Sequence, residues 1–158
     1  MKTILTKKCY EELKEKLYNL TYKDQSEASE QVAECRPIGC FEDNPEYLQS
    51  MENLAQINRK IIELNNLLSN CIILTKDISD RNKNIVAFGA TVTFKNIETD
   101  KETTYTILSI YDSNINDGTI SIEAPLVKQM IGLQVGDCFE FKDVDYEITN
   151  ISYSSQLY

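Results

Sequence analysis

Histidine is absent from this chain of 158 residues. Its absence excludes Ser-His-Asp and Cys-His catalysis, histidine metal ligands and the usual general base near neutral pH. The G-x-G-x-x-G, Walker A and C-x-x-C motifs are also missing. Any function must therefore come from carboxylates, thiols, surface shape or the active site of a partner.

Basic residues are scarce: 16 Lys and Arg stand against 25 Asp and Glu, a net charge of −9. Such a chain should not bind a nucleic-acid backbone or an anionic membrane on its own. No apolar run approaches the ~20 residues that cross a bilayer, and the start of the chain is too short and polar for a signal peptide. We therefore expect a cytoplasmic protein whose five cysteines are reduced.

The first half of the chain has the periodicity of a helix. Residues 6–36 contain neither Pro nor Gly, and Thr6 is a suitable N-cap. Leucines spaced four and three apart share one face, which continues weakly toward the end of the segment. This face comprises Leu13, Leu17, Leu20, Ala28, Val32 and Cys35.

A reversal and a second helix follow. Pro37 ends the first helix and Gly39 permits a tight turn. Asn44 and Pro45 predict an N-cap and first helical residue, with the helix ending near Leu68. Its predicted seam is Tyr47, Met51, Leu54, Asn58, Ile61, Asn65 and Leu68. We predict a protruding antiparallel coiled coil with an acidic tip; a packed piece of a helical bundle is the alternative.

The second half changes to a period of two. Strands are predicted over 91–95, 103–110, 119–122, 138–141 and 146–153, with a short helix over 125–131 closed by Gly132. The fold class is therefore α+β, with an antiparallel sheet and one helix packed on it. The predicted organisation is a hairpin domain over 1–76, a polar linker over 77–84 and a sheet domain over 85–158.

Three segments resemble one known family. Residues 34–47 read E-C-R-P-I-G-C-F-E-D-N-P-E-Y, residues 88–92 read F-G-A-T-V, and 120–126 read I-S-I-E-A-P-L, followed by Ile131-Gly132 and Gly136-Asp137. In order and spacing they resemble the bacterial Gre transcript cleavage factors, GreA and GreB, over nearly the whole chain. The resemblance implies an FKBP-like C-terminal domain.

The resemblance also implies the activity. Family members bind bacterial RNA polymerase, insert the coiled coil into its secondary channel and stimulate cleavage of backtracked RNA. Tip carboxylates, here Asp43 with Glu42, help hold a catalytic Mg²⁺ and a water there. The implied factor is a monomer with no active site, metal or cofactor of its own, and it meets the RNA 3′ end only inside the polymerase complex.

The resemblance further places polymerase docking at the short helix of the second half. The residues concerned are Pro125, Leu126, Lys128 and Met130. Packing of Leu126 and Met130 into the core is an equally weighted alternative.

The tip departs from the family pattern. The family has Asp directly after Gly, where this chain has Cys40, and Glu where it has Asp43. A thiol is poorly suited to Mg²⁺. In one interpretation, slightly favoured, Asp43 with Glu42 or Glu46 still assists hydrolysis. In the other, the chain regulates or inhibits polymerase from the channel without cleavage.

Other functions are weaker hypotheses. Cys35 and Cys40 could form a redox-sensitive disulfide if their Cα atoms lie within about 7 Å. An FKBP-like domain raises prolyl isomerase activity, which needs an aromatic-lined pocket. A purely structural coiled coil is the remaining class.

Overall fold

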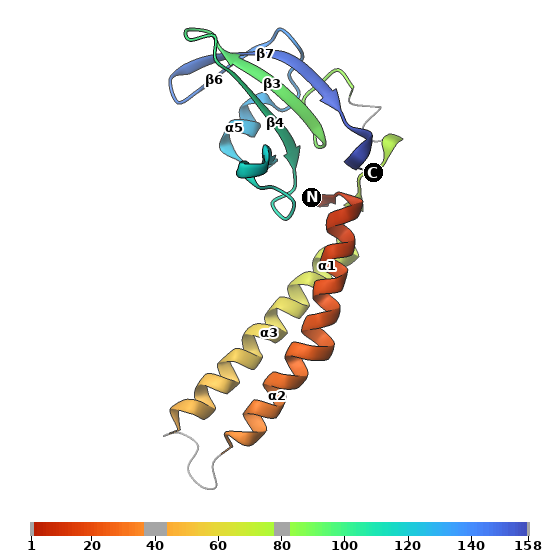
Figure 1. Ribbon diagram of the computed structural model, residues 1–158, viewed down its shortest axis with the longest axis vertical. Coiled ribbons are helices and arrows are strands. Elements are labelled where there is room, and N and C mark those ends of the chain that lie inside the picture. The colour runs from red at the N-terminus through yellow and green to blue at the C-terminus, as the bar shows by residue number, and fades with distance from the viewer. Residues whose placement is uncertain (1, 37–43, 78–82, 158) are drawn as a thin grey trace. The chain divides into compact units, whose positions relative to one another are not determined.

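The computed structural model describes residues 2–36, 44–77 and 83–157 (Figure 1). The predicted turn residues Pro37 and Gly39 and most of the predicted linker lie outside these ranges. The chain divides into two compact units, Glu11–Asn70, and Met1–Tyr10 together with Cys71–Tyr158. Residues 1–10 thus group with the sheet, although the sequence suggested a hairpin domain over 1–76. No helix among the described residues is long and apolar enough to cross a membrane.

The first arm of the hairpin is helical throughout. It comprises α1 (Lys7–Asn19), a π-helical turn (Leu20–Asp24) and α2 (Gln25–Glu34). The backbone N–H of Cys9 donates to Thr6 Oγ1 at 3.2 Å, which confirms the predicted cap. The extent of the arm is also confirmed. The π-helical turn was not predicted.

The π-helical turn accommodates one residue more than the helical repeat allows. Inward positions recur every 3.5 residues on average, so a face that includes Leu13 and Leu20 should next reach position 27. The buried residue is instead Ala28, 2% exposed. In the turn, the Gln25 N–H donates to the Leu20 carbonyl, five residues back. The extra residue is absorbed there, and Gln25 Nε2 donates to Asn58 Oδ1 at 2.7 Å.

Deleting the exposed Lys23 should therefore leave the hairpin intact, because a regular α-helix then keeps the inward face in phase. We expect the free energy of unfolding to stay within about 0.5 kcal/mol of wild type. Deleting the exposed Glu30 from α2 is the control, since it turns Val32 and Cys35 off the inward face and should cost about 1–3 kcal/mol. Urea unfolding followed by circular dichroism measures both. Equal losses for the two deletions would contradict this account.

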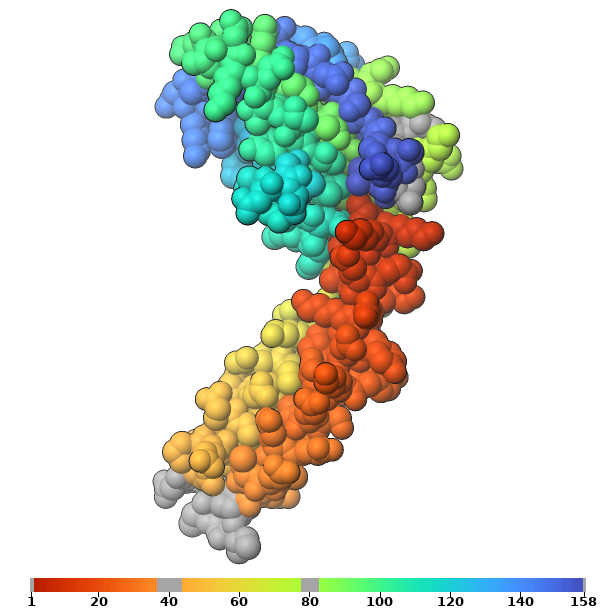
Figure 2. Space-filling view, viewed as in Figure 1, coloured from red at the N-terminus to blue at the C-terminus, as the bar shows by residue number. Residues whose placement is uncertain are grey.

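The second arm is α3 (Pro45–Asn70). In the space-filling view it lies beside α2 (Figure 2). Its buried residues are Ser50 and Leu64, whereas Met51 is 45% exposed and Asn65 is exposed. The predicted seam was therefore wrong at Met51 and Asn65. Ser50 can occupy a buried position because its hydroxyl donates to the Tyr47 carbonyl at 2.8 Å.

A sheet of five strands forms the second unit. The strands are β3 (Ala90–Asn96), β4 (Glu102–Leu108), β5 (Thr119–Ser121), β6 (Cys138–Phe141) and β7 (Val144–Tyr153), in the order β5-β4-β3-β7-β6. The predicted antiparallel pairing is confirmed except between β4 and β5, which run parallel. The reason is that residues 109–118 form a longer crossing connection and not a tight hairpin.

One face of the sheet carries the core of this unit. Val92 and Phe94 of β3 are buried and share that face, as predicted. Helix α5 (Pro125–Met130) covers it (Figure 1) and contributes Val127 and Met130, both 0% exposed. Phe94 packs edge-on against Phe139, with ring centroids 5.6 Å apart. The predicted α+β class with one packed helix is confirmed.

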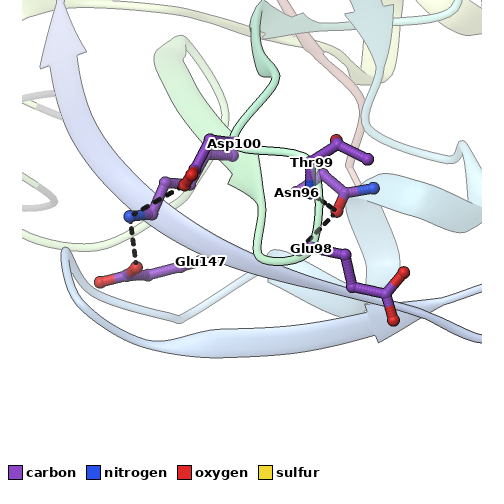
Figure 3. A network of polar contacts seen from close by, with 6 residues as sticks. Asn96, Glu98, Thr99, Asp100 and Glu147 are labelled. Carbon is purple, nitrogen blue, oxygen red and sulfur yellow. Dashed lines mark hydrogen bonds and ion pairs between the residues drawn. The ribbon is translucent and has the colours of Figure 1, made fainter.

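The turn between β3 and β4 is closed by side-chain contacts (Figure 3). Asn96 Oδ1 accepts hydrogen bonds from the backbone N–H groups of Glu98 and Thr99, at 2.8 and 3.0 Å. Lys95 Nζ lies 3.3 Å from Glu147 Oε2 and 4.0 Å from Asp100 Oδ1. Ion pairs this exposed contribute little stability, so the asparagine bonds define the turn.

Two very short strands were missed from the sequence. β1 (Ile4–Leu5) and β2 (Ile72–Ile73) pair in parallel. Leu5 and Leu74 are buried, 0% and 1% exposed, and the Leu74 N–H donates to the Leu5 carbonyl at 2.8 Å. Because β1 precedes α1 and β2 follows α3, the chain enters and leaves the hairpin through this pair.

Candidate functional site

The end of the hairpin is closed by the side chain of Asn44. Its Oδ1 accepts from the Tyr47 N–H at 3.2 Å, which confirms the predicted N-cap of α3. Its Nδ2 donates to the Cys35 carbonyl, at the end of α2, at 3.5 Å. One amide thus caps the second arm and joins it to the first. The hydrogen bond between Asn44 and Cys35 thus joins residues on either side of the segment that carries the predicted tip.

The predicted tip residues Cys40, Glu42 and Asp43 lie outside the described residues. The sequence places Asp43 next to Asn44, so the described cap begins one residue after that carboxylate. Glu46 is exposed in the first turn of α3, where the helix dipole favours a negative charge. Cys35 is half-buried. The predicted disulfide with Cys40 and the predicted metal-assisting role of the tip stay predictions.

An open depression of about 700 Å³ lies beside the hairpin end. Its lining is mainly polar and uncharged: Gln31, Cys35, Pro45, Glu46, Gln49, Ser50 and Asn53. Farther along α3, hydrogen bonds from Gln56 and Arg59 lower the pKa of the exposed Glu52 carboxyl. The amide side chains of the depression can donate and accept hydrogen bonds, and its reactive groups are the Cys35 thiol, the Glu46 carboxylate and the Ser50 hydroxyl.

The sheet-containing unit has a cavity of about 360 Å³. Phe88, Ile4 and Ile122 supply apolar lining, and residues 109–111 form another part of the wall. The charged lining residues, Lys2, Glu123 and Lys128, are all exposed. We call this feature the loop cavity. Its apolar lining and charged surroundings suit a protein segment with an apolar side chain.

The predicted docking residues are distributed between surface and core. Pro125 and Lys128 are exposed, and Lys128 lines the loop cavity. Leu126 is half-buried and packs against the core. Met130 is fully buried, so the core-packing alternative describes it and it offers no surface for a partner.

Two exposed apolar residues at the loop cavity were missed from the sequence. Ile110 and Tyr111 follow the end of β4 after one intervening residue and are 58% and 51% exposed. The predicted strand continued through 110, which placed Ile110 in the ladder. The polar run after Tyr111 (D-S-N-I-N-D) was the available signal that the strand ends earlier.

Comparison with known proteins gives a consistent result over both units. The family model described as "Transcription elongation factor, N-terminal" matches residues 3–73, and "Transcription elongation factor, GreA/GreB, C-term" matches residues 81–153. Together these two matches cover the hairpin and the sheet. They support the resemblance carried by the tip and the later strands.

Two GreA relatives agree with the family matches. Transcription elongation factor GreA of Nautilia profundicola is 34% identical over 153 residues, which cover 94% of this chain and 93% of the relative. GreA of Rickettsia felis is 33% identical over the same coverage. The crystal structure of Gfh1 from Thermus thermophilus aligns with 96% of this chain and 99% of its own, at 20% identity and a TM-score of 0.45. By its family models and full-length relatives, this chain belongs to the GreA/GreB family of transcription elongation factors.

Proposed function

We propose that this chain binds RNA polymerase, inserts the end of its hairpin into the secondary channel and stimulates cleavage of RNA in backtracked complexes. The observation that carries the proposal is the acidic E-D-N-P-E segment at the hairpin end, followed by a helix whose cap residue, Asn44, also bonds to the first arm. The catalytic centre belongs to polymerase, so the chain is not itself an enzyme. We place it in the cytoplasm, where its partner works.

The tip would act through oxygen ligands. Mg²⁺ held mainly by polymerase supplies charge neutralisation and an activated water in such a complex. Asp43 and Glu42 are the residues that would contribute carboxylate oxygens, which are the ligands that Mg²⁺ prefers. The thiol of Cys40 does not suit that ion. On this chemistry Asp43 is the principal carboxylate and Cys40 contributes none.

The loop cavity is the proposed docking surface for polymerase. Lys128 is an exposed residue of its lining, Pro125 is exposed on the same short helix, and Ile110 and Tyr111 add apolar area. Exposed apolar residues of this kind, rimmed by charged ones, commonly mark protein interaction sites. Met130 is left out of this surface because it is buried.

A second candidate function rests on Cys40 alone. Without a carboxylate directly after Gly39, the hairpin could occupy the channel and regulate or inhibit polymerase without assisting hydrolysis. Family membership is compatible with both candidates, and Asp43 favours the cleaving one.

An RNA cleavage assay on purified, backtracked elongation complexes tests the proposal. We expect the wild-type chain to bind polymerase and to release short 3′ fragments at a rate well above that of polymerase alone. Binding without faster cleavage would replace the proposal by the regulatory candidate. No binding to polymerase would overturn both.

A further inference from the structure

We infer that Asp112 is a positioning residue for the hairpin. Its carboxylate orients the Thr6 hydroxyl that caps α1, and so holds the start of that helix against the loop that lines the loop cavity. The inference rests on the proposed function. Thr6 and Asp112 are 106 positions apart in the chain and belong to the same compact unit.

The contacts converge on one carboxylate. Thr6 Oγ1 lies 3.0 Å from Asp112 Oδ2 and 3.1 Å from Oδ1, and the Thr6 N–H donates to Oδ2 at 3.4 Å. Ser109 Oγ approaches Oδ2 at 3.5 Å. Thr6 and Ser109 are 4% and 2% exposed. Asp112 therefore accepts hydrogen bonds from groups that are largely withdrawn from water.

The hydroxyl of Thr6 has two tasks. A threonine hydroxyl has one proton to donate and lone pairs that accept. Because the Thr6 hydroxyl donates its hydrogen bond to the Asp112 carboxylate, a lone pair of the hydroxyl oxygen is left to accept from the Cys9 N–H, which lies 3.2 Å from Thr6 Oγ1. The negative charge of Asp112 at the start of α1 also favours the positive end of the helix dipole. Asp112 thus acts on the helix through Thr6.

The same loop connects the helix start to the loop cavity. Residues 109–111 line the cavity, and Asp112 follows directly. Thr3 and Ile4, which lead into Thr6 and α1, also line it. A partner seated in the cavity would touch both segments that the Thr6–Asp112 contact joins. Docking of the partner and anchoring of the first arm therefore share residues.

Hydrogen exchange tests the anchoring without polymerase. In Asp112→Ala, the amide of Cys9 should exchange roughly 5- to 30-fold faster, the usual effect of losing a helix cap. Thr6→Ala should give a similar increase, and the double variant should add little to either. Asp145→Ala, which replaces an exposed aspartate of β7, is the control, and in it the Cys9 amide should exchange at the wild-type rate. Additive effects of the two single changes, or normal exchange in Asp112→Ala, would overturn the inference.

Cleavage kinetics test positioning. At saturating protein, Asp112→Ala should cleave backtracked RNA roughly 10-fold more slowly than wild type, with a smaller change in the concentration giving half-maximal rate. Asp112→Asn, which keeps an acceptor oxygen, should recover part of the rate. The inference would be overturned if the cleavage rate of Asp112→Ala equals that of wild type, or if it falls only in proportion to the fraction of the variant that is folded. Failure of wild type to cleave would instead overturn the proposed function, while the exchange result stands independently.

Discussion

Asp43→Ala should reduce the stimulated rate of RNA cleavage about 10²-fold while leaving polymerase binding unchanged. The physical reason is that removing one preorganised group that stabilises charge at a reacting centre can slow the reaction about 10²- to 10³-fold. In this chain the loss should be large, because Cys40 stands where the family has a second carboxylate. Binding should persist because the proposed docking surface lies on the sheet-containing unit.

The control for this experiment is Glu42→Ala, which removes the neighbouring carboxylate. We expect a smaller loss from it, since Glu42 matches no acidic position of the family tip. Cys40→Asp should cleave faster than wild type, because it restores an oxygen ligand suited to Mg²⁺. If wild type and Asp43→Ala are equally inactive and only Cys40→Asp cleaves, the regulatory candidate is the right one.

Phe94→Ala should cost about 3–5 kcal/mol of unfolding free energy. Phe94 is 3% exposed on the central strand β3. Its ring lies 5.6 Å from that of Phe139 and 5.5 Å from that of Tyr146, both edge-on, and 6.2 Å from that of Tyr105. Truncation removes these contacts together and leaves a cavity that the surrounding strands can fill only partly. A loss of this size is a large part of a domain's stability.

Urea unfolding, followed by the fluorescence of the tyrosines, measures this loss. Ile97→Ala is the matched control, since Ile97 follows the same strand but is 46% exposed. It should change the unfolding free energy by no more than about 0.5 kcal/mol. A cost below about 1 kcal/mol for Phe94→Ala would mean that this aromatic cluster is not the centre of the core.

The elements with local signals were predicted from the sequence. Thr6 and Asn44 cap their helices as expected because the bonds that cap a helix join residues only three apart. The strand over Cys138–Phe141 has the predicted bounds. Alternation also placed Val92 and Phe94 on the buried face, since a strand turns successive side chains to opposite sides.

The errors have a common cause. Met51 and Ser50 are adjacent on α3, and hydrophobicity favoured Met51, but packing against the first arm buries Ser50. β1 and β2 were missed because strands of two residues carry no period. The one-residue excess in the first arm gave no local sign. It requires a π-helical turn only because Ala28 of the first arm is buried and Gln25 bonds to Asn58 of the partner helix α3.

By itself, the amino-acid order determined the two helical arms, the alternating strands and the motifs that indicate the family, because each is carried by residues close together in the chain. Tertiary structure alone decided which helix faces meet, that β5 runs parallel to β4, that Met130 lies in the core, and that Asp112 reaches Thr6. The physical reason is that those outcomes depend on groups far apart in the chain, whose meeting is set by packing and by the need to satisfy buried hydrogen-bonding groups.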